Sequence, residues 1–361
     1  MHVGNGGEPV IATTRKPWIR RYRTALLVGI FILLFLFANF KSWPYVLYGP
    51  GSAEPVHPRV ETGHKLDEKG ALLFTTVSSY SRPNVFSILY AWINPRMDIQ
   101  TEETATGGAT NLAAYRNLLA WMRDSSEDNA LLAAYNVMNK EIDVSQQGVI
   151  IVRLLPESKA RENGLQEGDI ITHVDGKEAN TVQVLSAYIS GKKAGETVKV
   201  SGTRGDKTFE ATVPLITMPS SDRTGIGFQN DTVLEVTPPD PVKFDFDDTG
   251  GPSAGLMMTL EIIAQLTGED LTRGYRIAGT GTIAADGTVG QIGGIQYKLM
   301  AADREKADYF LVPYDEKSGA PNWKLAEETV KKLDLSPKLI RVSTLSEALE
   351  FLKKLEPKKE T

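Results

Sequence analysis

Cysteine is absent from this chain of 361 residues, and histidine is scarce, with four residues. The lack of cysteine excludes disulfides, thiolate metal sites and a cysteine nucleophile. The sequence also lacks the H-E-x-x-H motif of zinc peptidases and the G-x-x-x-x-G-K-[ST] phosphate loop of nucleotide-hydrolysing enzymes. We therefore expect no metal, no cofactor and no use of ATP.

The charge balance excludes a further class of partner. The formal net charge is −5, with 24% charged and 41% hydrophobic residues. Such a composition is typical of globular protein and argues against a nucleic-acid partner. The length allows two modest domains and additional segments.

One long uncharged run stands out, at residues 24–40. A helix of this length spans roughly 25 Å, near the lower limit for crossing a bilayer. Basic residues precede the run, namely Arg15, Lys16, Arg20, Arg21 and Arg23. The positive-inside rule then places residues 1–23 in the cytoplasm and the domains after the run outside. A buried core helix and a cleaved signal peptide are the alternatives to this uncleaved, single-pass membrane anchor.

Two segments near the C-terminal end carry the chemistry. The first, Gly250–Gly255, places Ser253 at the start of an apolar, helix-spaced stretch. Unpaired N–H groups in the first turn of such a helix can stabilise an oxyanion. The candidate residues for the oxyanion and the substrate backbone are Gly251, Pro252, Ala254 and Gly255. A simpler alternative is that Ser253 only caps the helix.

The second segment, Ile292–Lys298, places a lysine among apolar neighbours. Burial lowers the pKa of a lysine amine, so that the neutral amine can take a proton from a serine hydroxyl. The pair of Ser253 and Lys298 therefore indicates a serine–lysine peptidase. Without further support, a lysine on a solvated helix face is the commoner case.

That support is a resemblance to the proteolytic domain of the Lon protease family. The matching residues are Gly251–Gly255, Thr280-Gly281, Gly287–Val289 and Ile292–Gly294, with Lys298 four residues later. The resemblance implies that Ser253 is the nucleophile, Lys298 the base and Thr280 a hydroxyl that orients the amine. Thr280 as an ordinary strand residue is the alternative. The acid that the family often has three positions before the serine is Gly250 here, and we assign no role to Asp247 or Asp248.

A second resemblance, to bacterial PDZ domains, covers residues 146–216. Its signature runs from Asn163-Gly164-Leu165 through Gly168-Asp169-Ile170 to Asp175-Gly176. PDZ domains bind a peptide C-terminus by adding it as a strand. We expect Gly148, Val149 and Ile150 to form that site, or else that the domain only positions or gates the catalytic domain.

The predicted fold class is α+β, with an N-terminal transmembrane helix, a PDZ-like β-sandwich or barrel and a Lon-like α/β proteolytic domain. We expect a linker at 41–69, a strand and helices that pack on the catalytic domain at 70–145, and the proteolytic domain at 217–356. If residues 71–77 pair with expected strands at 233–236 and 243–246, the PDZ unit is an insertion within the catalytic domain.

The whole chain resembles the membrane-anchored PDZ–Lon-like peptidases of Gram-positive bacteria. This implies an ATP-independent serine endopeptidase that acts on secreted or membrane-proximal peptides and proteins, and a homo-oligomer is compatible with it. The alternative from another class is a cell-surface PDZ scaffold with an inactive protease-like domain. A cytoplasm-facing quality-control protease would require the inverted topology.

Overall fold

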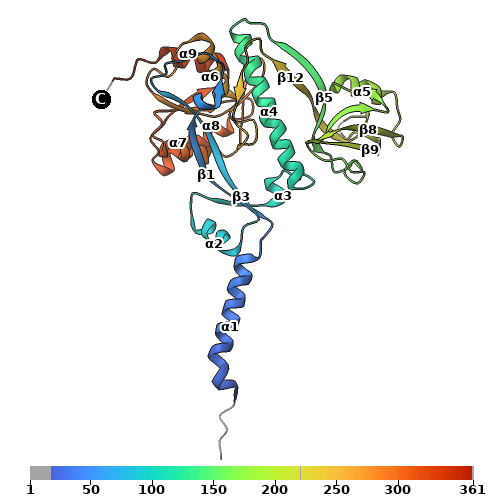
Figure 1. Cartoon of the computed structure of the whole chain (residues 1–361), viewed down its shortest axis with the longest axis vertical. Helices are drawn as coiled ribbons and strands as arrows, with labels where there is room; N and C mark the ends of the chain where they lie inside the picture. The colour runs from blue at the N-terminus through green and yellow to red at the C-terminus, as the bar shows by residue number, and fades with distance from the viewer. Residues whose placement is uncertain (1–17, 220, 360–361) are drawn as a thin grey trace, which may run out of the picture.

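A computed structural model describes residues 18–219 and 221–359. Most of the predicted basic tail, residues 1–17, lies outside this part of the chain. Figure 1 shows α1 (Trp18–Phe40) extending away from two folded units, which are connected by a long ribbon of β5 and β12. The segment Tyr22–Phe40 has a mean hydropathy of 2.1 and no buried residue, so α1 is long and apolar enough to cross a membrane.

The larger unit is built on a mixed sheet of six strands with the order β18-β17-β14-β3-β1-β4. Neighbours among β18, β17, β14 and β3 are parallel, whereas β1 runs antiparallel to both β3 and β4. The strands are β1 (Tyr45–Pro55), β3 (Ala71–Ser81), β4 (Asp98–Thr101), β14 (Arg276–Gly279), β17 (Tyr309–Pro313) and β18 (Lys338–Val342).

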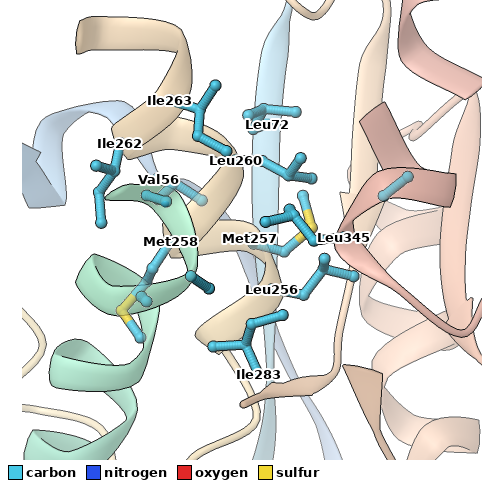
Figure 2. Packing of buried hydrophobic residues seen from close by; sticks show 14 of the residues in the cluster. Val56, Leu72, Leu256, Met257, Met258, Leu260, Ile262, Ile263, Ile283 and Leu345 are labelled. Carbon is cyan, nitrogen blue, oxygen red and sulfur yellow. The ribbon is translucent and has the colours of Figure 1, made fainter. Parts of the chain in front are cut away.

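Helices cover both faces of this sheet because successive strand residues point to opposite sides. On β3, Leu72 and Phe74 belong to one hydrophobic cluster, whereas Ala71 and Leu73 belong to another. The first cluster includes residues of α4 (Leu112–Val137), α6 (Gly255–Thr267) and α9 (Leu345–Lys354), and the second includes residues of α7 (Ile295–Arg304) and α8 (Pro321–Leu333). In Figure 2, Leu260 of α6 lies beside Leu72, and Met258 faces α4. The result is three layers, helix–sheet–helix.

The smaller unit is an antiparallel sheet with the order β12-β5-β6-β8-β9 and one helix, α5 (Val182–Ser190). Its strands are β5 (Asp143–Leu154), β6 (Ile170–Val174), β7 (Lys177–Glu178, paired with β6), β8 (Thr197–Arg204), β9 (Lys207–Pro214) and β12 (Phe228–Thr237). A separate hydrophobic core, with Val149, Ile171 and Leu185 among its members, holds this unit together.

The remaining elements are short. They are η1 (His57–Arg59), β2 (Val60–Glu61), α2 (Val85–Ile93), α3 (Glu102–Ala105), β10 (Ile216–Thr217), β11 (Thr224–Gly225), β13 (Lys243–Phe244), β15 (Thr282–Ile283) and β16 (Val289–Gly290). Three antiparallel pairs form among them, β2 with β13, β10 with β11, and β15 with β16.

The α+β class is confirmed, but two predictions about the chain path are wrong. Residues 41–69 are not a linker, because they contain β1, which lies inside the larger sheet. The expected strand at 233–236 belongs to β12 and pairs with β5, and the one at 243–246 forms β13, which pairs with β2. β3 pairs instead with β1 and β14. The smaller unit nevertheless lies, in chain order, between β4 and β14 of the larger sheet.

Candidate active site

Ser253 lies just before α6, which begins at Gly255 with Ala254 as the N-cap. The serine is thus not in the first helical turn as predicted, and its side chain does not cap the helix. Helix α4 packs closely against this start. A Cβ at Gly255 would lie 2.8 Å from Oγ of Ser126, whose hydroxyl donates to the carbonyl of Pro252 at 3.0 Å. These contacts with α4 fix the backbone around the serine.

Lys298 lies in the first turn of α7, which starts after Gly294. Gly294 has φ +70°, and a Cβ there would lie 2.8 Å from Cγ2 of Val77 on β3. A glycine adopts this left-handed conformation without strain and lets the helix begin against the strand. Lys298 is only 2% exposed.

The two side chains meet in a small polar contact. Nζ of Lys298 lies 2.9 Å from Oγ of Ser253 and donates to the carbonyl oxygen of Thr75 at 2.6 Å. Burial lowers the pKa of Lys298 from its ordinary value of 10.5 to about 7. A neutral amine in this position can donate to Thr75 and still accept the proton of the Ser253 hydroxyl.

Thr280 is fully buried beside the serine rather than beside the amine. Its hydroxyl donates to the carbonyl of Ser253 at 3.0 Å, and the N–H of Gly281 donates to the same oxygen at 2.9 Å. No hydrogen bond joins Thr280 and Lys298 in the described chain. The predicted orienting role on the amine therefore has no counterpart in these contacts, which instead hold the backbone of Ser253.

The four predicted oxyanion and backbone residues are not equivalent. The N–H of Gly251 donates to the carbonyl of Leu119 at 3.0 Å, and that of Gly255 donates to Pro252 at 3.3 Å. Proline has no N–H. Within residues 18–219 and 221–359, the N–H groups of Ser253 and Ala254 have no hydrogen-bond partner, so these two are the free donors beside the hydroxyl.

A cleft of about 660 Å³ opens over Ser253 and Lys298. Its lining includes Tyr48 of β1, Tyr115 of α4 and Tyr297 of α7. These tyrosines could not be chosen from the sequence, since they come from elements whose place around the cleft depends on long-range packing.

The two acids near the serine each pair with an arginine. Asp248 accepts a hydrogen bond from Arg59 at 2.6 Å, which lowers the pKa of that carboxyl, and Asp247 lies 3.3 Å from Arg123. Both contacts are partly exposed, so each acid is an ordinary ion-pair partner at the edge of the site.

Gly251–Gly255 spells G-x-S-x-G, a pattern that also occurs at the nucleophile of serine–histidine hydrolases. Here the partner of the hydroxyl is a lysine. Of the histidines that the structure describes, His57, His64 and His173, none contacts Ser253. The motif alone would therefore have suggested a histidine partner that the described residues do not supply.

Gly148, Val149 and Ile150 do not form a peptide groove. They lie in β5, which is paired on both sides, with β12 through Val149–Thr232 and with β6 through Val149–Ile171. A peptide cannot be added to a strand with two occupied edges. The predicted PDZ site at these residues is wrong.

A different groove, of about 490 Å³, lies between α5 and β12. β12 is the terminal strand of its sheet, so its outer edge is not paired in the described chain. The lining of this groove includes Gly225-Ile226-Gly227-Phe228, in which glycine and hydrophobic residues alternate, and the sequence-based prediction of the peptide site missed this loop because it lies after residue 216. The N–H groups of Ile226 and Gly227 donate to no partner among the described residues. Arg223 also lines this groove.

Comparisons with known proteins assign the two units. The model of the Lon protease (S16) C-terminal proteolytic domain matches residues 246–352, and a PDZ-domain model matches residues 126–215. The Lon protease of Neorickettsia sennetsu is 37% identical over 101 residues, which are 28% of this chain and 11% of that protein. The Lon protease of Haemophilus influenzae is 28% identical over 180 residues, 49% of this chain and 20% of that protein.

Other similarities fall on the PDZ unit. The PDZ domain of an SdrC-like protein from Listeria monocytogenes has 32% identity, covers 24% of this chain and 92% of that one, and has a TM-score of 0.23. The periplasmic pH-dependent serine endoprotease DegQ of Escherichia coli is 36% identical over 76 residues, 21% of this chain and 17% of that protein. The chain thus matches a fifth or less of the length of these Lon and DegQ relatives. It joins a PDZ domain to a Lon-type proteolytic domain, and this combination fits a PDZ-containing Lon-like protease.

Proposed function

We propose that the protein is an ATP-independent serine endopeptidase in which Ser253 is the nucleophile and Lys298 the general base. The observation that carries the proposal is the 2.9 Å contact between Nζ of Lys298 and Oγ of Ser253, made by an amine whose pKa is about 7. A hydroxyl needs an adjacent base to become a nucleophile, and a base with a pKa near the working pH serves best.

The reaction follows from these positions. Lys298 takes the hydroxyl proton as Oγ of Ser253 attacks the carbonyl carbon of the scissile bond. The N–H groups of Ser253 and Ala254 stabilise the resulting oxyanion. Lys298 then gives the proton to the leaving amine, and the C–N bond breaks to leave an ester on Ser253. Water, deprotonated by Lys298, hydrolyses this ester and releases the second product.

Independence from ATP is supported by the sequence, since the chain contains no phosphate-loop motif. The cleft of about 660 Å³ suits extended segments rather than folded domains. The proposed substrates are therefore short, unfolded or exposed stretches of peptides and proteins.

The membrane location is supported by a second element beside α1. Helix α2 exposes several large apolar side chains, including Leu89, Trp92 and Ile93. It also contacts α1 through Phe86 and Phe35, whose rings are 5.4 Å apart. We propose that α1 spans the membrane and α2 lies in the interface, with the charge rule placing the folded units outside.

The groove between α5 and β12 suits capture of a substrate C-terminus. An extended peptide can pair with the outer edge of β12, and the N–H groups of Ile226 and Gly227 can hold its carboxylate. This would bring the preceding segment of the substrate to the same molecule that cleaves it.

The alternative function is a PDZ scaffold with an inactive protease-like domain. Labelling with a fluorophosphonate probe, which reacts with activated serines, distinguishes the two functions. The proposal predicts a covalent adduct on Ser253 by mass spectrometry and no adduct in Ser253→Ala. Lys298→Arg, which keeps a cation but cannot act as the base, should label at least 100-fold more slowly. Equal labelling of wild type and Lys298→Arg would contradict the proposed role of Lys298, and failure of the wild type to label would favour the scaffold.

A further inference from the structure

Three side chains from two distant parts of the sequence meet beside the middle of α6. They are His57 of η1, Glu68 in the connection to β3, and Glu261 in the second turn of α6. One potential ligand atom from each lies within 4.8 Å of the others. Nothing in the proposed peptidase reaction uses these residues, and none of them lines the cleft over Ser253.

The acidic pair is short of hydrogen-bond donors. Glu261 is 0% exposed, and its Oε1 accepts hydrogen bonds from Nε2 of Gln265 and from Nδ1 of His57, each at 2.7 Å. Its second oxygen, Oε2, has no partner, and neither does the buried Oε1 of Glu68. Two neighbouring carboxylates with unpaired buried oxygens are unfavourable unless one of them is protonated or a cation lies between them.

We propose that His57, Glu68 and Glu261 bind one divalent transition-metal cation, with Zn²⁺ as the ion that suits them best. One imidazole nitrogen and two carboxylates make a mixed nitrogen–oxygen ligand set, which favours zinc-like ions over Ca²⁺ and Mg²⁺. Zinc bonds of roughly 2.0–2.2 Å set the ligand atoms of a tetrahedral site about 3.4 Å apart, so atoms that lie within 4.8 Å of one another need only a small movement to reach that geometry. His57 and Glu68 are only partly buried and can make that movement.

The surroundings fit a built site. The side chain of His57 is 41% exposed, so an ion can enter from solvent. Nε2 of Gln265 donates a hydrogen bond to Glu261. The same amide also donates to the carbonyl of Val60 at 2.7 Å and accepts from the hydroxyl of Thr62 at 3.0 Å. Such outer contacts orient metal ligands.

The position of the cluster indicates a structural role. His57 and Glu68 lie in the segment between β1 and β3, and Glu261 lies in α6, the helix that follows Ser253. A metal ion bound by all three would therefore link that segment to the helix. Glu261 lies six residues along that helix from Gly255, or roughly 9 Å at 1.5 Å per residue, so the ion would stabilise the fold around the nucleophile without touching substrate. The sequence could not predict the site, because its ligands have no characteristic spacing.

The test uses the full-length chain in detergent, with the purification tag removed and metal stripped by EDTA. Zn²⁺ is titrated against a chromophoric chelator, bound metal is counted by mass spectrometry, and thermal unfolding is followed with and without Zn²⁺. We expect one Zn²⁺ per chain and a higher unfolding temperature with the metal. Glu68→Gln and Glu261→Gln should weaken binding at least tenfold and abolish the shift in unfolding temperature.

Glu61→Gln and His64→Gln are matched controls from the same segment and should bind like the wild type. Glu261→Gln should also fold without metal, since its amide can donate toward Glu68. If it does not fold, Zn²⁺ binding by Glu68→Gln and His57→Gln provides the test instead.

Absence of Zn²⁺ binding by the wild type, or unchanged Zn²⁺ binding by the Glu68 and Glu261 variants, would contradict the proposed site. Ser253→Ala should bind Zn²⁺ normally, which separates this claim from the peptidase proposal.

Discussion

At the scale of single residues, the environment of Lys298 explains how a lysine can act as a base. Its amine is enclosed by the protein, forms hydrogen bonds only with Ser253 and a backbone carbonyl among the described residues, and has no carboxylate partner there that would favour its charged form. Desolvation therefore lowers its pKa to about 7 without an opposing charge.

This burial should make stability depend on pH. The folded protein releases the Lys298 proton near pH 7, whereas the unfolded chain keeps it up to about pH 10.5. The unfolded state thus binds more protons in this window, and the free energy of unfolding rises with pH from about 7 to 10.5 and is flat below. The test uses a Ser253→Ala background, which prevents self-cleavage. Raising the pH from about 7.5 to 9 should increase its free energy of unfolding by about 2 kcal/mol, and this increase should be absent when Lys298→Met is added. Urea unfolding at both pH values measures the free energy of unfolding. The same change with pH in the proteins with and without Lys298→Met would refute a lowered pKa.

Thr280 gives a second prediction at this scale. Thr280→Val keeps the shape but removes the hydrogen bond to the carbonyl of Ser253. At about 1 kcal/mol for one such bond, kcat/KM should fall roughly fivefold, and Thr280→Ser should restore it. Because Thr280 holds the serine backbone and not the amine, the apparent pKa of the rate profile should not move. A shifted pKa in Thr280→Val would show that the hydroxyl acts on Lys298.

Only part of the site could be predicted from the residues themselves. Ser253 and Lys298 stand in recognisable motifs, so their positions were accessible from the sequence. Thr75 contributes a backbone carbonyl, which has no side-chain signature, and it meets Lys298 across 223 residues of chain. Ser126 is likewise one serine among many until α4 packs against α6. Contacts of this kind depend on tertiary structure and leave no local pattern.

At the scale of elements, the start of α7 sets the position of Lys298, the proposed base. Gly294→Ala would place a methyl group 2.8 Å from Val77 in a left-handed backbone conformation. We expect a loss of roughly 1–3 kcal/mol in stability, and a lower kcat because Lys298 moves relative to Ser253. Gly293→Ala is the matched control, since a Cβ there meets nothing within 4 Å. Thermal unfolding and peptide cleavage measure both effects, and equal behaviour of the two variants would contradict this role of Gly294.

The elements also show where sequence patterns mislead. Gly49-Pro50-Gly51 indicates a turn or linker, yet it lies within β1 at an irregularity in the pairing with β3. A Cβ at Gly51 would lie 2.3 Å from Oγ1 of Thr76, so the glycine is there for close strand contact. Glycine and proline mark a break in local structure, but the neighbouring strands decide whether the chain leaves the sheet.

At the scale of the whole molecule, the long ribbon of β5 and β12 connects the unit with the proposed peptide groove to the unit that contains Ser253 and Lys298 (Figure 1). The same strand, β12, borders the proposed peptide groove and runs back toward α4, which forms one wall of the cleft. The sequence indicated both domains but not their connection, because the pairing of β12 with β5 joins the first and last strands of the smaller unit.

The groove should therefore affect substrate binding more than chemistry. Substrate peptides with a free C-terminal carboxylate should have a lower KM than the same peptides with a C-terminal amide, at similar kcat. Ala187→Glu, which places a negative charge in the groove, should remove this difference. Steady-state cleavage of both peptides provides the measurement. A preference for the free carboxylate that survives in Ala187→Glu would place its recognition elsewhere.

The most direct test of the central claim is ATP-free cleavage of casein by the full-length protein, Ser253→Ala and Lys298→Ala. Folding of each variant is checked by circular dichroism. The account predicts cleavage by the wild type, with kcat/KM rising through an apparent pKa of about 7, and at least a thousandfold loss in both variants. Cleavage that persists in either folded variant, or that requires ATP in the wild type, would contradict the Ser253–Lys298 mechanism.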